Sequence, residues 1–330
     1  MAAAAEVSVV IPVGTGSPYA AEVVAAVLRT SPGPAQVVVV NDRVADGSLA
    51  ALPADARVQV VRNDGPPGPS AARNAGARAA RCPYLLFLDA DVFVRPDICA
   101  RLARAFAAGA DAVVGIEAEV AAPNLASRYK NLWMRYTYLK LPRRIELFYT
   151  SCAAVRRDLY VAVGGMDEGY RSPSVEDTAF GRTLAARGAR IVLEKEIAVE
   201  HRKTYTPGRL LVTAFRRGAA MGRCILRLAR RGVEGNWTSV PTTFVISLPF
   251  AALAPLWWAA APWSVAVAAA GCAGSLAAVY VLNLGWLSYL ASREPRLLFW
   301  ALPYLPVELA AGFAGGGWGT LSYLFLRRRY

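Results

Sequence analysis

Charged side chains are missing from one long part of this chain. Of the 330 residues, 18% are charged, against about 25% in a typical globular domain. From Gly235 to Ser292 there are 58 residues without Asp, Glu, Lys, Arg or His. A bilayer crossing takes about 20 apolar residues, so this stretch predicts two spans, which we place at Thr242–Pro262 and Ser264–Ala291. A buried helical hairpin of a soluble protein is the alternative, and the length of the stretch argues against it.

Cysteine is scarce, and its spacing excludes some classes of site. No two of the five cysteines have Cys-x-x-Cys spacing, and one falls in a predicted span. This pattern favours reduced cytoplasmic thiols over a disulfide framework or a zinc site. The N-terminus has no basic segment, and its apolar run stops at Pro12 after the acid Glu6. We therefore expect no signal peptide.

A third apolar stretch, Leu297–Leu326, contains one acid, Glu308, together with two prolines and a run of three glycines. It fits either one kinked span or a re-entrant hairpin, which is tolerated where protein covers the backbone at membrane depth. Basic residues flank it on both sides, at Arg293 and Arg296 and again at 327–329. Because basic flanks stay in the cytoplasm, we favour the hairpin, which returns the chain to the side it came from.

The net charge of +13 raises the question of nucleic-acid binding, but the distribution of the charge disfavours it. Nine basic residues and no acid lie between Arg202 and Arg231, just before the first predicted span. Apolar residues recur among them at near-helical spacing, which is typical of an amphipathic helix lying on anionic lipid. Alternatively, some of these arginines face a phosphate-bearing substrate. We expect membrane lipids and no nucleic acid as partners.

Aromatic and basic residues are interleaved in the segment 123–147. This mixture favours a membrane interface. The segment is then either a second surface helix or one wall of an acceptor groove. A stacking platform for nucleic acid is disfavoured, because the chain ends in membrane spans.

Strands and helices alternate through residues 1–206. The predicted strands are Val7–Val13, Gln36–Asn41, Arg57–Arg62, Tyr84–Leu88, Asp111–Glu117 and Ile197–Val199, and the predicted helices include Pro69–Ala80, Pro96–Ala107 and 176–188. This alternation predicts an α/β fold with a mostly parallel, doubly wound sheet. We divide the chain into an α/β domain at 1–206, a basic juxtamembrane helix at 207–234 and a membrane domain at 235–330.

Two acids directly follow the most apolar of these strands. Tyr84–Leu88 consists of five consecutive apolar residues, typical of a buried parallel strand, and Asp89-Ala90-Asp91 comes next. Ligands of open α/β sheets collect at the carboxyl ends of strands. Two carboxylates there can hold a divalent cation, which in turn can hold a diphosphate. An acidic turn after a core strand is the alternative.

Five short motifs follow one another along roughly residues 7–205. They are Ser8-Val9-Val10-Ile11-Pro12-Val13, Val38-Val39-Val40-Asn41-Asp42, Gly68-Pro69-Ser70-Ala71-Ala72-Arg73-Asn74-Ala75-Gly76, Asp89-Ala90-Asp91 and Glu176-Asp177. This order resembles family-2 glycosyltransferases of the GT-A fold, and the Arg-Asn-x-Gly stretch and the Glu-Asp pair are its most specific parts. Enzymes of this family take a sugar from a nucleotide-diphospho-sugar with inversion of the anomeric carbon.

The resemblance implies a donor site at the strand ends. The backbone of Pro12 and Val13 would contact the nucleoside, and Asp42 would accept hydrogen bonds from the base or ribose. Arg73 would point at the base or a phosphate, a task that suits its planar guanidinium. Asp89 would reach the ribose or the metal. For Asp42, a strand-end turn is the alternative.

The resemblance also implies a metal, Mg²⁺ or Mn²⁺. Asp91 would ligate it directly, with Asp89 beside it, and the cation would neutralise charge on the departing nucleoside diphosphate. The only histidine, His201, would be a further ligand or a phosphate contact, since a neutral imidazole is a good ligand. The alternative is that His201 only packs against its neighbours. Arg202 and Lys203 would assist the diphosphate.

Asp177 is the predicted general base, taking the proton of an acceptor hydroxyl. Its neighbour Glu176 would orient a nearby group, and the glycine-rich segment 164–170, which contains Gly165, would form a flexible acceptor loop. Alternatively, the Glu-Asp pair is simply an acidic first turn of a helix, which the helix dipole favours. This explanation is compatible with a catalytic role.

The sequence departs from the family pattern in three places. Gly14-Thr15-Gly16-Ser17 stands where many members have Tyr-Asn-Glu, which puts the nucleoside lid in doubt. The usual Asp-Asp-Gly-Ser is spread over 41–48, so Asp46 competes with Asp42 for the base contact. There is no Gln-x-x-Arg-Trp motif, which argues for single sugar transfer over processive synthesis.

These observations lead to one functional hypothesis with three alternatives. We expect a multi-pass protein of the cytoplasmic (inner) membrane, its catalytic domain on the cytoplasmic side, that glycosylates a hydroxyl of a lipid-linked or envelope glycan acceptor. A polyprenyl-phosphate glycosyl synthase is the alternative in chemistry, and a non-catalytic scaffold with a degenerate fold is the alternative in class. A nucleotidyltransferase is disfavoured, because Gly14-Thr15-Gly16 has no lysine nearby.

Overall fold

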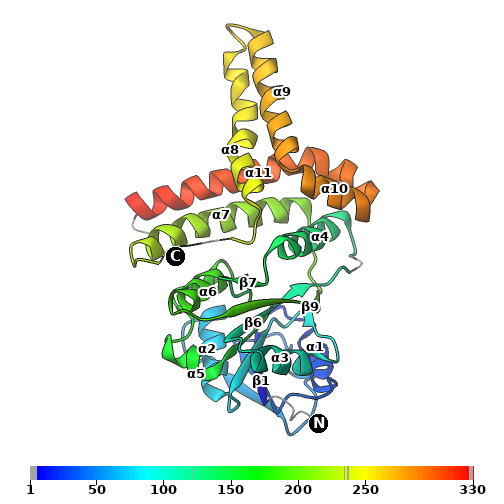
Figure 1. Cartoon of the computed structure of the whole chain (residues 1–330), viewed down its shortest axis with the longest axis vertical. Helices are drawn as coiled ribbons and strands as arrows, with labels where there is room; N and C mark the ends of the chain where they lie inside the picture. Colours follow the sequence, from blue (N-terminus) through cyan, green and yellow to red (C-terminus); the bar gives the residue numbers. More distant parts are fainter. Residues whose placement is uncertain (1–5, 121, 234, 236–237, 327–329) are drawn as a thin grey trace. The chain divides into compact units, whose positions relative to one another are not determined.

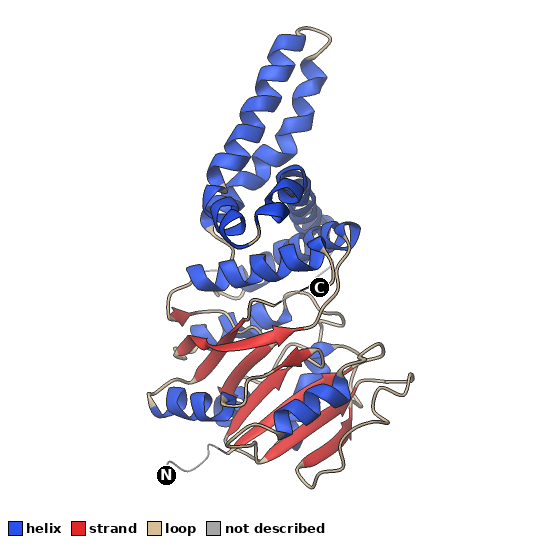
Figure 2. Cartoon of the chain, turned by 90° about the vertical axis from the view of Figure 1, so that its right-hand side faces the viewer, coloured by secondary structure: helices blue, strands red, loops and turns tan. Residues whose placement is uncertain are grey.

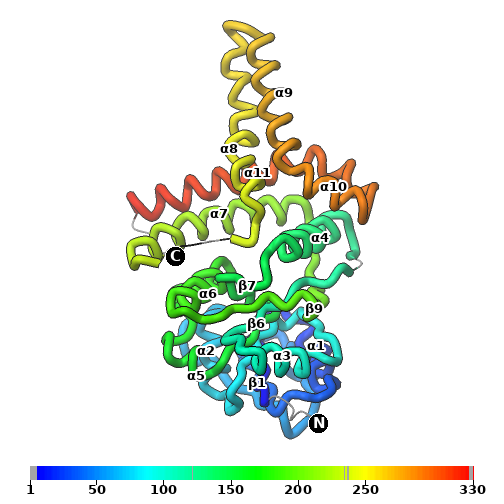
Figure 3. The backbone as a smooth tube through the Cα atoms, in the orientation of Figure 1, coloured from blue at the N-terminus to red at the C-terminus, as the bar shows by residue number. Residues whose placement is uncertain are grey.

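The structure is a computed structural model that describes residues 6–120, 122–233, 235, 238–326 and 330 (Figures 1 and 3). The chain forms two compact units. The first, here called the sheet unit, comprises Met1–Ala118, Leu141–Lys203 and Gly232–Thr238. The second, here called the helical unit, comprises Glu119–Lys140, Thr204–Arg231 and Ser239–Tyr330.

The described part of the sheet unit contains one nine-stranded sheet in the order β3-β2-β1-β4-β8-β6-β9-β5, with β7 paired to β9. Strands β3, β2, β1 and β4 are parallel, whereas β8 is antiparallel to both β4 and β6. The strands are β1 (Val7–Val13), β2 (Gln36–Asn41), β3 (Val58–Arg62), β4 (Tyr84–Leu88), β5 (Val92–Phe93), β6 (Ala112–Glu117), β7 (Arg144–Ile145), β8 (Cys152–Arg156) and β9 (Ile191–His201). The predicted α/β class is confirmed, and β8 is the main strand that the sequence pattern did not suggest.

Helices cover both faces of this sheet, which explains why β1 and β4 are almost uninterrupted apolar runs (Figure 2). Alternate residues of β1 pack in one core with α1 (Ala20–Leu28) and α3 (Ile98–Ala107). On the other face lies α2 (Pro69–Ala79). A Cβ at Gly76 of α2 would lie 2.3 Å from Val10 Cγ1 and 2.9 Å from Val40 Cγ2, so this glycine lets the helix approach the sheet closely.

Two more helices complete the sheet unit, α5 (Arg157–Ala162) and α6 (Glu176–Ala186). The aromatic ring of Phe180 in α6 packs against Phe148 and Tyr160, with ring centroids 5.2 and 5.1 Å apart. A Cβ at Gly181 would lie 2.5 Å from the backbone nitrogen of Phe148. This close packing fixes the N-terminus of α6, where the Glu-Asp pair lies.

The helical unit contains α4 (Leu125–Lys140), α7 (Pro207–Ala229), α8 (Thr242–Leu256), α9 (Val265–Leu282), α10 (Leu284–Arg293) and α11 (Pro295–Phe325). The aromatic residues of α4 are largely buried within this unit. Tyr129 and Trp133 contact Trp286 of α10, with ring centroids 5.5 and 5.1 Å apart. The aromatics of segment 123–147 thus form a core with the C-terminal helices, while several basic residues of the same helix stay partly exposed.

Among the described residues, three helices are long and apolar enough to cross a membrane: Thr242–Ala260, Val265–Leu282 and Pro295–Phe325. The first agrees with the predicted span to within two residues. The second ends at Leu282, well before the predicted Ala291. There Asn283 is buried, and its amide donates to Ser247 Oγ at 3.0 Å and to the carbonyl of Val279 at 2.8 Å, which separates α9 from α10.

The re-entrant hairpin favoured for 297–326 is wrong, because α11 is one continuous helix of 31 residues with Pro303 and Pro306 inside it. Each proline removes one intrahelical hydrogen bond, which neighbouring helices compensate in apolar surroundings. The terminal arginines at 327–329, on which the hairpin argument partly depended, lie outside the described residues.

Candidate active site

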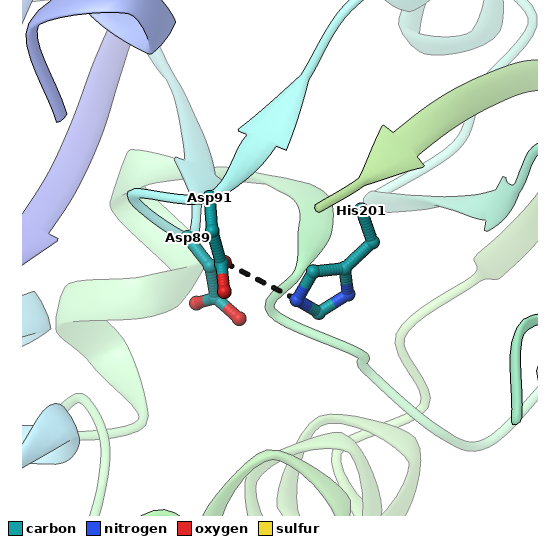
Figure 4. A group of neighbouring side chains, drawn as sticks. All are labelled: Asp89, Asp91 and His201. Carbon is teal, nitrogen blue, oxygen red and sulfur yellow. Dashed lines mark ion pairs between the residues drawn. The ribbon is translucent and has the colours of Figure 1, made fainter. Parts of the chain in front are cut away.

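Three predicted metal ligands lie together in the sheet unit. Asp89, Asp91 and His201 offer ligand atoms that all lie within 4.8 Å of one another (Figure 4). Both aspartates follow β4, and His201 is the last residue of β9, which pairs with β5 directly opposite Val92. The sheet therefore brings together residues more than a hundred positions apart in the sequence.

A fourth residue, Glu117, fixes the orientation of the histidine. His201 Nδ1 lies 3.1 Å from Glu117 Oε1, and His201 Nε2 lies 3.2 Å from Asp91 Oδ1. Burial alone would lower the pKa of His201, but the two neighbouring carboxylates outweigh it and raise this pKa to about 10. Burial likewise opposes the ionised form of Asp91, while His201 and Lys203 lower the pKa of its carboxyl.

The residues present fit a divalent cation. Although it is close to Asp91, His201 Nε2 is a buried nitrogen without a well-formed hydrogen bond among the described residues. It points toward the two aspartates (Figure 4). Two carboxylates and an imidazole are a donor set that suits Mn²⁺, and Mg²⁺ with additional waters. A histidine whose other ring nitrogen bonds to a carboxylate is the usual arrangement of a metal ligand.

The acidic edge is linked to α6 by a buried arginine. Arg73 of α2 donates to Asp89 Oδ1 at 2.8 Å and to Glu176 Oε1 at 3.1 Å. The side chains of Arg73 and Glu176 are each only 5% exposed, so the pair is well shielded from water. Arg73 is thus engaged by two carboxylates, one from the acidic edge and one from α6.

Asp177 lies on the first turn of α6, next to Glu176, and is half-buried. Its Oδ1 accepts from the backbone N–H of Thr178 at 2.6 Å. The carboxylate is also close enough to Arg73 to interact with it electrostatically. Asp177 therefore lies close to the Arg73–Asp89 pair, at the N-terminus of α6.

The glycine-rich segment after α5 is anchored by Asn74, the neighbour of Arg73. Asn74 Oδ1 accepts from Tyr160 Oη and from the backbone N–H of Met166, and its amide donates to the Met166 carbonyl and to Glu168. Gly165 has φ +72°, and a Cβ there would lie 2.6 Å from Asn74 Oδ1. Both its conformation and this contact require glycine. The predicted flexible loop is thus tied at its start.

The predicted nucleoside contacts lie at the ends of β1 and β2, where Pro12 and Val13 pair with Val40 and Asn41. Asp42 follows β2 and accepts from Asn63 Nδ2 at 2.7 Å and from the N–H of Gly68 at 2.9 Å. It therefore braces the turn that leads into α2. Asp46, the other candidate for the base contact, is exposed. It accepts hydrogen bonds from Ser48 and Gly16, which lower the pKa of Asp46 to about 2.

Arg202 has partners outside the acidic cluster. Its backbone N–H donates to the Asp91 carbonyl at 2.9 Å, but its guanidinium pairs with Glu200 and Glu22. The guanidinium also lies over the ring of Phe93, 3.9 Å from the centroid. The side chain is therefore held on the α1 and β5 side by these groups.

Sequence reasoning missed Glu117 and the anchoring role of Asn74. Glu117 ends β6 much as Asp89 follows β4: an apolar run stops at an acid. Because both strands are antiparallel to β8, their carboxyl ends lie at the same edge. An apolar strand that ends in an acid is a pattern visible in the sequence. Applied to β6 as well as β4, this pattern identifies Glu117 together with Asp89.

Comparisons with known proteins agree with this geometry. Residues 8–164 match the sequence profile described as "Glycosyl transferase family 2". Among curated proteins, the succinoglycan biosynthesis protein ExoO of Rhizobium meliloti (strain 1021) is 47% identical over 83 residues, 24% of each chain. The uncharacterized glycosyltransferase EpsJ of Bacillus subtilis (strain 168) is 34% identical over 100 residues, 29% of each chain. These matches thus span less than a third of either relative.

A solved structure matches over nearly the whole chain. The mannosyltransferase PcManGT from Pyrobaculum calidifontis, in complex with GDP-Man and Mn²⁺, aligns with 95% of this chain and 87% of its own, with a TM-score of 0.57 and 20% identity. At this identity the likeness speaks to the fold. Together with the sheet order and the ordered motifs, it leads to one conclusion: the chain has the GT-A fold, and its residues 8–164 are similar to glycosyltransferase family 2.

Proposed function

We propose that the chain is a membrane-associated, metal-dependent, inverting glycosyltransferase that moves a sugar from a nucleotide-diphospho-sugar to a hydroxyl acceptor. One observation carries the proposal: the Asp89–Asp91–His201 group is joined through Arg73 to the helix turn that bears Glu176 and Asp177. Metal ligands and a potential base are thus held within one network of charged side chains.

The donor would bind along the carboxyl edge of the sheet. Asp89, Asp91 and His201 would hold Mg²⁺ or Mn²⁺, which when bound neutralises charge on the leaving nucleoside diphosphate. Pro12, Val13 and Asp42 lie at the ends of β1 and β2, where they would contact the nucleoside. The similar mannosyltransferase structure is a complex with GDP-Man and Mn²⁺, which supports this class of donor.

Asp177 would act as the general base. Its carboxylate takes the proton of the acceptor hydroxyl as that oxygen forms a bond to the anomeric carbon and the bond to the diphosphate oxygen breaks. Attack from the opposite face inverts the anomeric carbon. Arg73 and Glu176 would hold the helix turn in place, and the segment anchored by Asn74 and Gly165 would border the acceptor.

The acceptor would be a lipid-linked or envelope glycan, glycosylated on the cytoplasmic side of the inner membrane. Three helices long and apolar enough to cross a bilayer support an acceptor close to the membrane. Four of the five cysteines are buried, and no disulfide joins any of them in the described part of the chain, as suits a reducing compartment. The name of one relative, which refers to succinoglycan biosynthesis, is compatible with this class of acceptor.

The test is a panel of nucleotide-sugar donors incubated with the full chain and Mn²⁺ or Mg²⁺, with and without chelator, scored for nucleoside diphosphate release. We expect release from one donor class, its loss with chelator and its loss in Asp91→Ala. A polyprenyl-phosphate acceptor is already ionised and needs no base, so retention of transfer in Asp177→Asn would favour that chemistry. Metal-dependent donor binding without any turnover would favour a scaffold.

A further inference from the structure

Helix α11 has the length and composition of a membrane span, but its contacts are not those of a span. Its 31 residues are long and apolar enough to cross a membrane, and at 1.5 Å per residue they extend about 46 Å. This exceeds the roughly 30 Å hydrocarbon core by half. The helices packed against α11 within the helical unit indicate a different orientation.

The second half of α11 packs against α7 with almost no side chains between them. A Cβ at Gly315 would lie 2.1 Å from the Phe215 carbonyl oxygen, and one at Gly319 would lie 2.1 Å from that of Ala219. From α7, a Cβ at Gly218 would lie 2.4 Å from the Gly312 carbonyl oxygen. Residue numbers rise together on the two helices, so they run parallel, side by side (Figures 1 and 2). Such close contact leaves the two helices one common orientation to a bilayer.

Helix α7 cannot be a membrane span. It and the two residues after it contain seven arginines, and the helix contains no acid. An arginine at the middle of a bilayer is strongly unfavourable, so seven of them exclude a crossing orientation. The arginines also tie the helices together: Arg223 donates to Ser322 Oγ at 3.4 Å, and Arg230 lies 5.0 Å from the ring centroid of Tyr323.

The middle of α11 is held by a second basic helix. Glu308, nine-tenths buried, accepts a hydrogen bond from Tyr129 Oη of α4 at 2.8 Å. Helix α4 contains four basic residues and no acid. If α11 crossed the bilayer, this contact would lie near the midplane and draw α4 into the hydrocarbon. Two independent contacts, with α4 and with α7, therefore exclude the centre of α11 from that depth.

We propose that α7 and α11 form a pair lying in the plane of the membrane at the headgroup boundary, and that only α8 and α9 cross the bilayer. The arginines of α7 suit anionic headgroups, and apolar residues of α11 with exposed fractions of 45% at Phe313 and 77% at Phe299 suit the acyl boundary. The α8–α9 hairpin stands transverse to the pair (Figure 1), as a crossing hairpin beside an in-plane pair would. The surface formed by α7 and α11 thus contacts an anionic lipid bilayer.

The first test is the sidedness of three exposed positions in the full chain reconstituted into anionic vesicles. Val60→Cys reports the sheet unit, Trp263→Cys the turn between α8 and α9, and Leu326→Cys the end of α11; all three side chains are exposed. We expect an impermeant maleimide to label positions 60 and 326 from the same side and 263 from the other. Labelling of 60 and 326 from opposite sides would overturn the proposal. The unsubstituted chain gives the background of the native cysteines.

The second test separates an in-plane helix from one that dips into the bilayer and returns. Spin labels at Phe299, Phe313 and Phe325 should report one shallow depth, equal within about one helical turn of 5 Å. Spin labels at Val267 and Val281 on α9 serve as the comparison. Their depths in the bilayer should differ by about 20 Å, because fourteen residues separate them. A label at Phe313 that reports the bilayer centre would overturn the proposal even if the sidedness test agreed with it.

Discussion

The two units of this protein both bury apolar side chains but expose different kinds. The sheet unit encloses apolar strands and gathers its acids, an arginine and a histidine at the carboxyl edge. The helical unit has an apolar core of its own but also exposes large apolar residues, with 84% of Trp263 and 74% of Phe325 accessible. Exposed aromatics are unfavourable in water but suit lipid. The comparison teaches that the outer surface of each unit, more than its core, reflects the surroundings of that unit.

Both units use glycine for close approach, with different partners. In the sheet unit, Gly76 lets α2 lie against valines of β1 and β2. In the helical unit, Gly315 and Gly319 let α11 lie against the backbone of α7. Where the driving force of water is absent, close van der Waals packing of small residues holds helices together. The substitutions below test each side of this comparison.

The largest effect is expected in the sheet unit from Asp91→Ala. Loss of a direct metal ligand removes several kcal/mol of charge stabilisation from the transition state, so nucleoside diphosphate release should fall by about 10³-fold. Added Mn²⁺ should restore it only in part. The matched control is Asp64→Ala, whose side chain is 85% exposed; equal loss in both variants would contradict the role of Asp91.

Asp177→Asn should reduce kcat by about 10² to 10⁴-fold, the usual contribution of a general base. The amide keeps the shape of the side chain but cannot take a proton. Donor affinity, measured by equilibrium binding in the presence of Mn²⁺, should stay unchanged. If donor affinity falls together with kcat, Asp177 contributes to binding and the general base lies elsewhere.

Glu117→Gln should weaken metal affinity by about 10-fold, because partners that orient a ligand have effects of 10- to 100-fold. The measurement is the Mn²⁺ concentration that gives half-maximal activity, which should rise while activity at saturating Mn²⁺ stays near that of the parent. Glu196→Gln serves as control, since it alters an acid on β9, the strand that carries His201, and its side chain is 76% exposed. An unchanged Mn²⁺ requirement in Glu117→Gln would show that Glu117 does not position His201.

The smallest effect is expected in the helical unit from Gly315→Ala. The added methyl group meets the Phe215 carbonyl, so the helices must separate, at a cost of about 1–3 kcal/mol. Gly317→Ala is the control, because among the described residues a Cβ there meets nothing within 4 Å. Thermal unfolding in lipid nanodiscs should give a lower Tm for Gly315→Ala than for Gly317→Ala. Equal Tm values would mean that α7 and α11 do not pack closely.

Much of the sheet unit was predictable, because its strands are distinctive apolar runs. The bounds of β1, β2 and β4 agree with the prediction residue for residue, and the Asp-x-Asp motif and His201 do meet. The strand β8 was not foreseen, since Cys152-Ala-Ala-Val-Arg156 is too short and too rich in alanine to distinguish from a helix or a loop. The role of Arg73 also depended on contacts across elements, which no local pattern contains.

The helical unit was less predictable, because composition identifies apolar helices without fixing their neighbours. Leu297–Leu326 fitted a kinked span or a hairpin, and the basic residues on both flanks favoured the hairpin. In the structure the prolines lie inside one helix, and Gly315 lies at its contact with α7. The close helix packing that these glycines permit becomes visible only when the partner helix is known.

The most direct test of the account is Mn²⁺ binding observed by electron paramagnetic resonance, in the full chain with a nucleoside diphosphate present. We predict one tightly bound ion whose signal carries hyperfine coupling to the His201 nitrogen and disappears in Asp91→Ala. An ion bound with equal affinity in that variant, or one without nitrogen coupling, would contradict the assignment of Asp89, Asp91 and His201 as the metal centre.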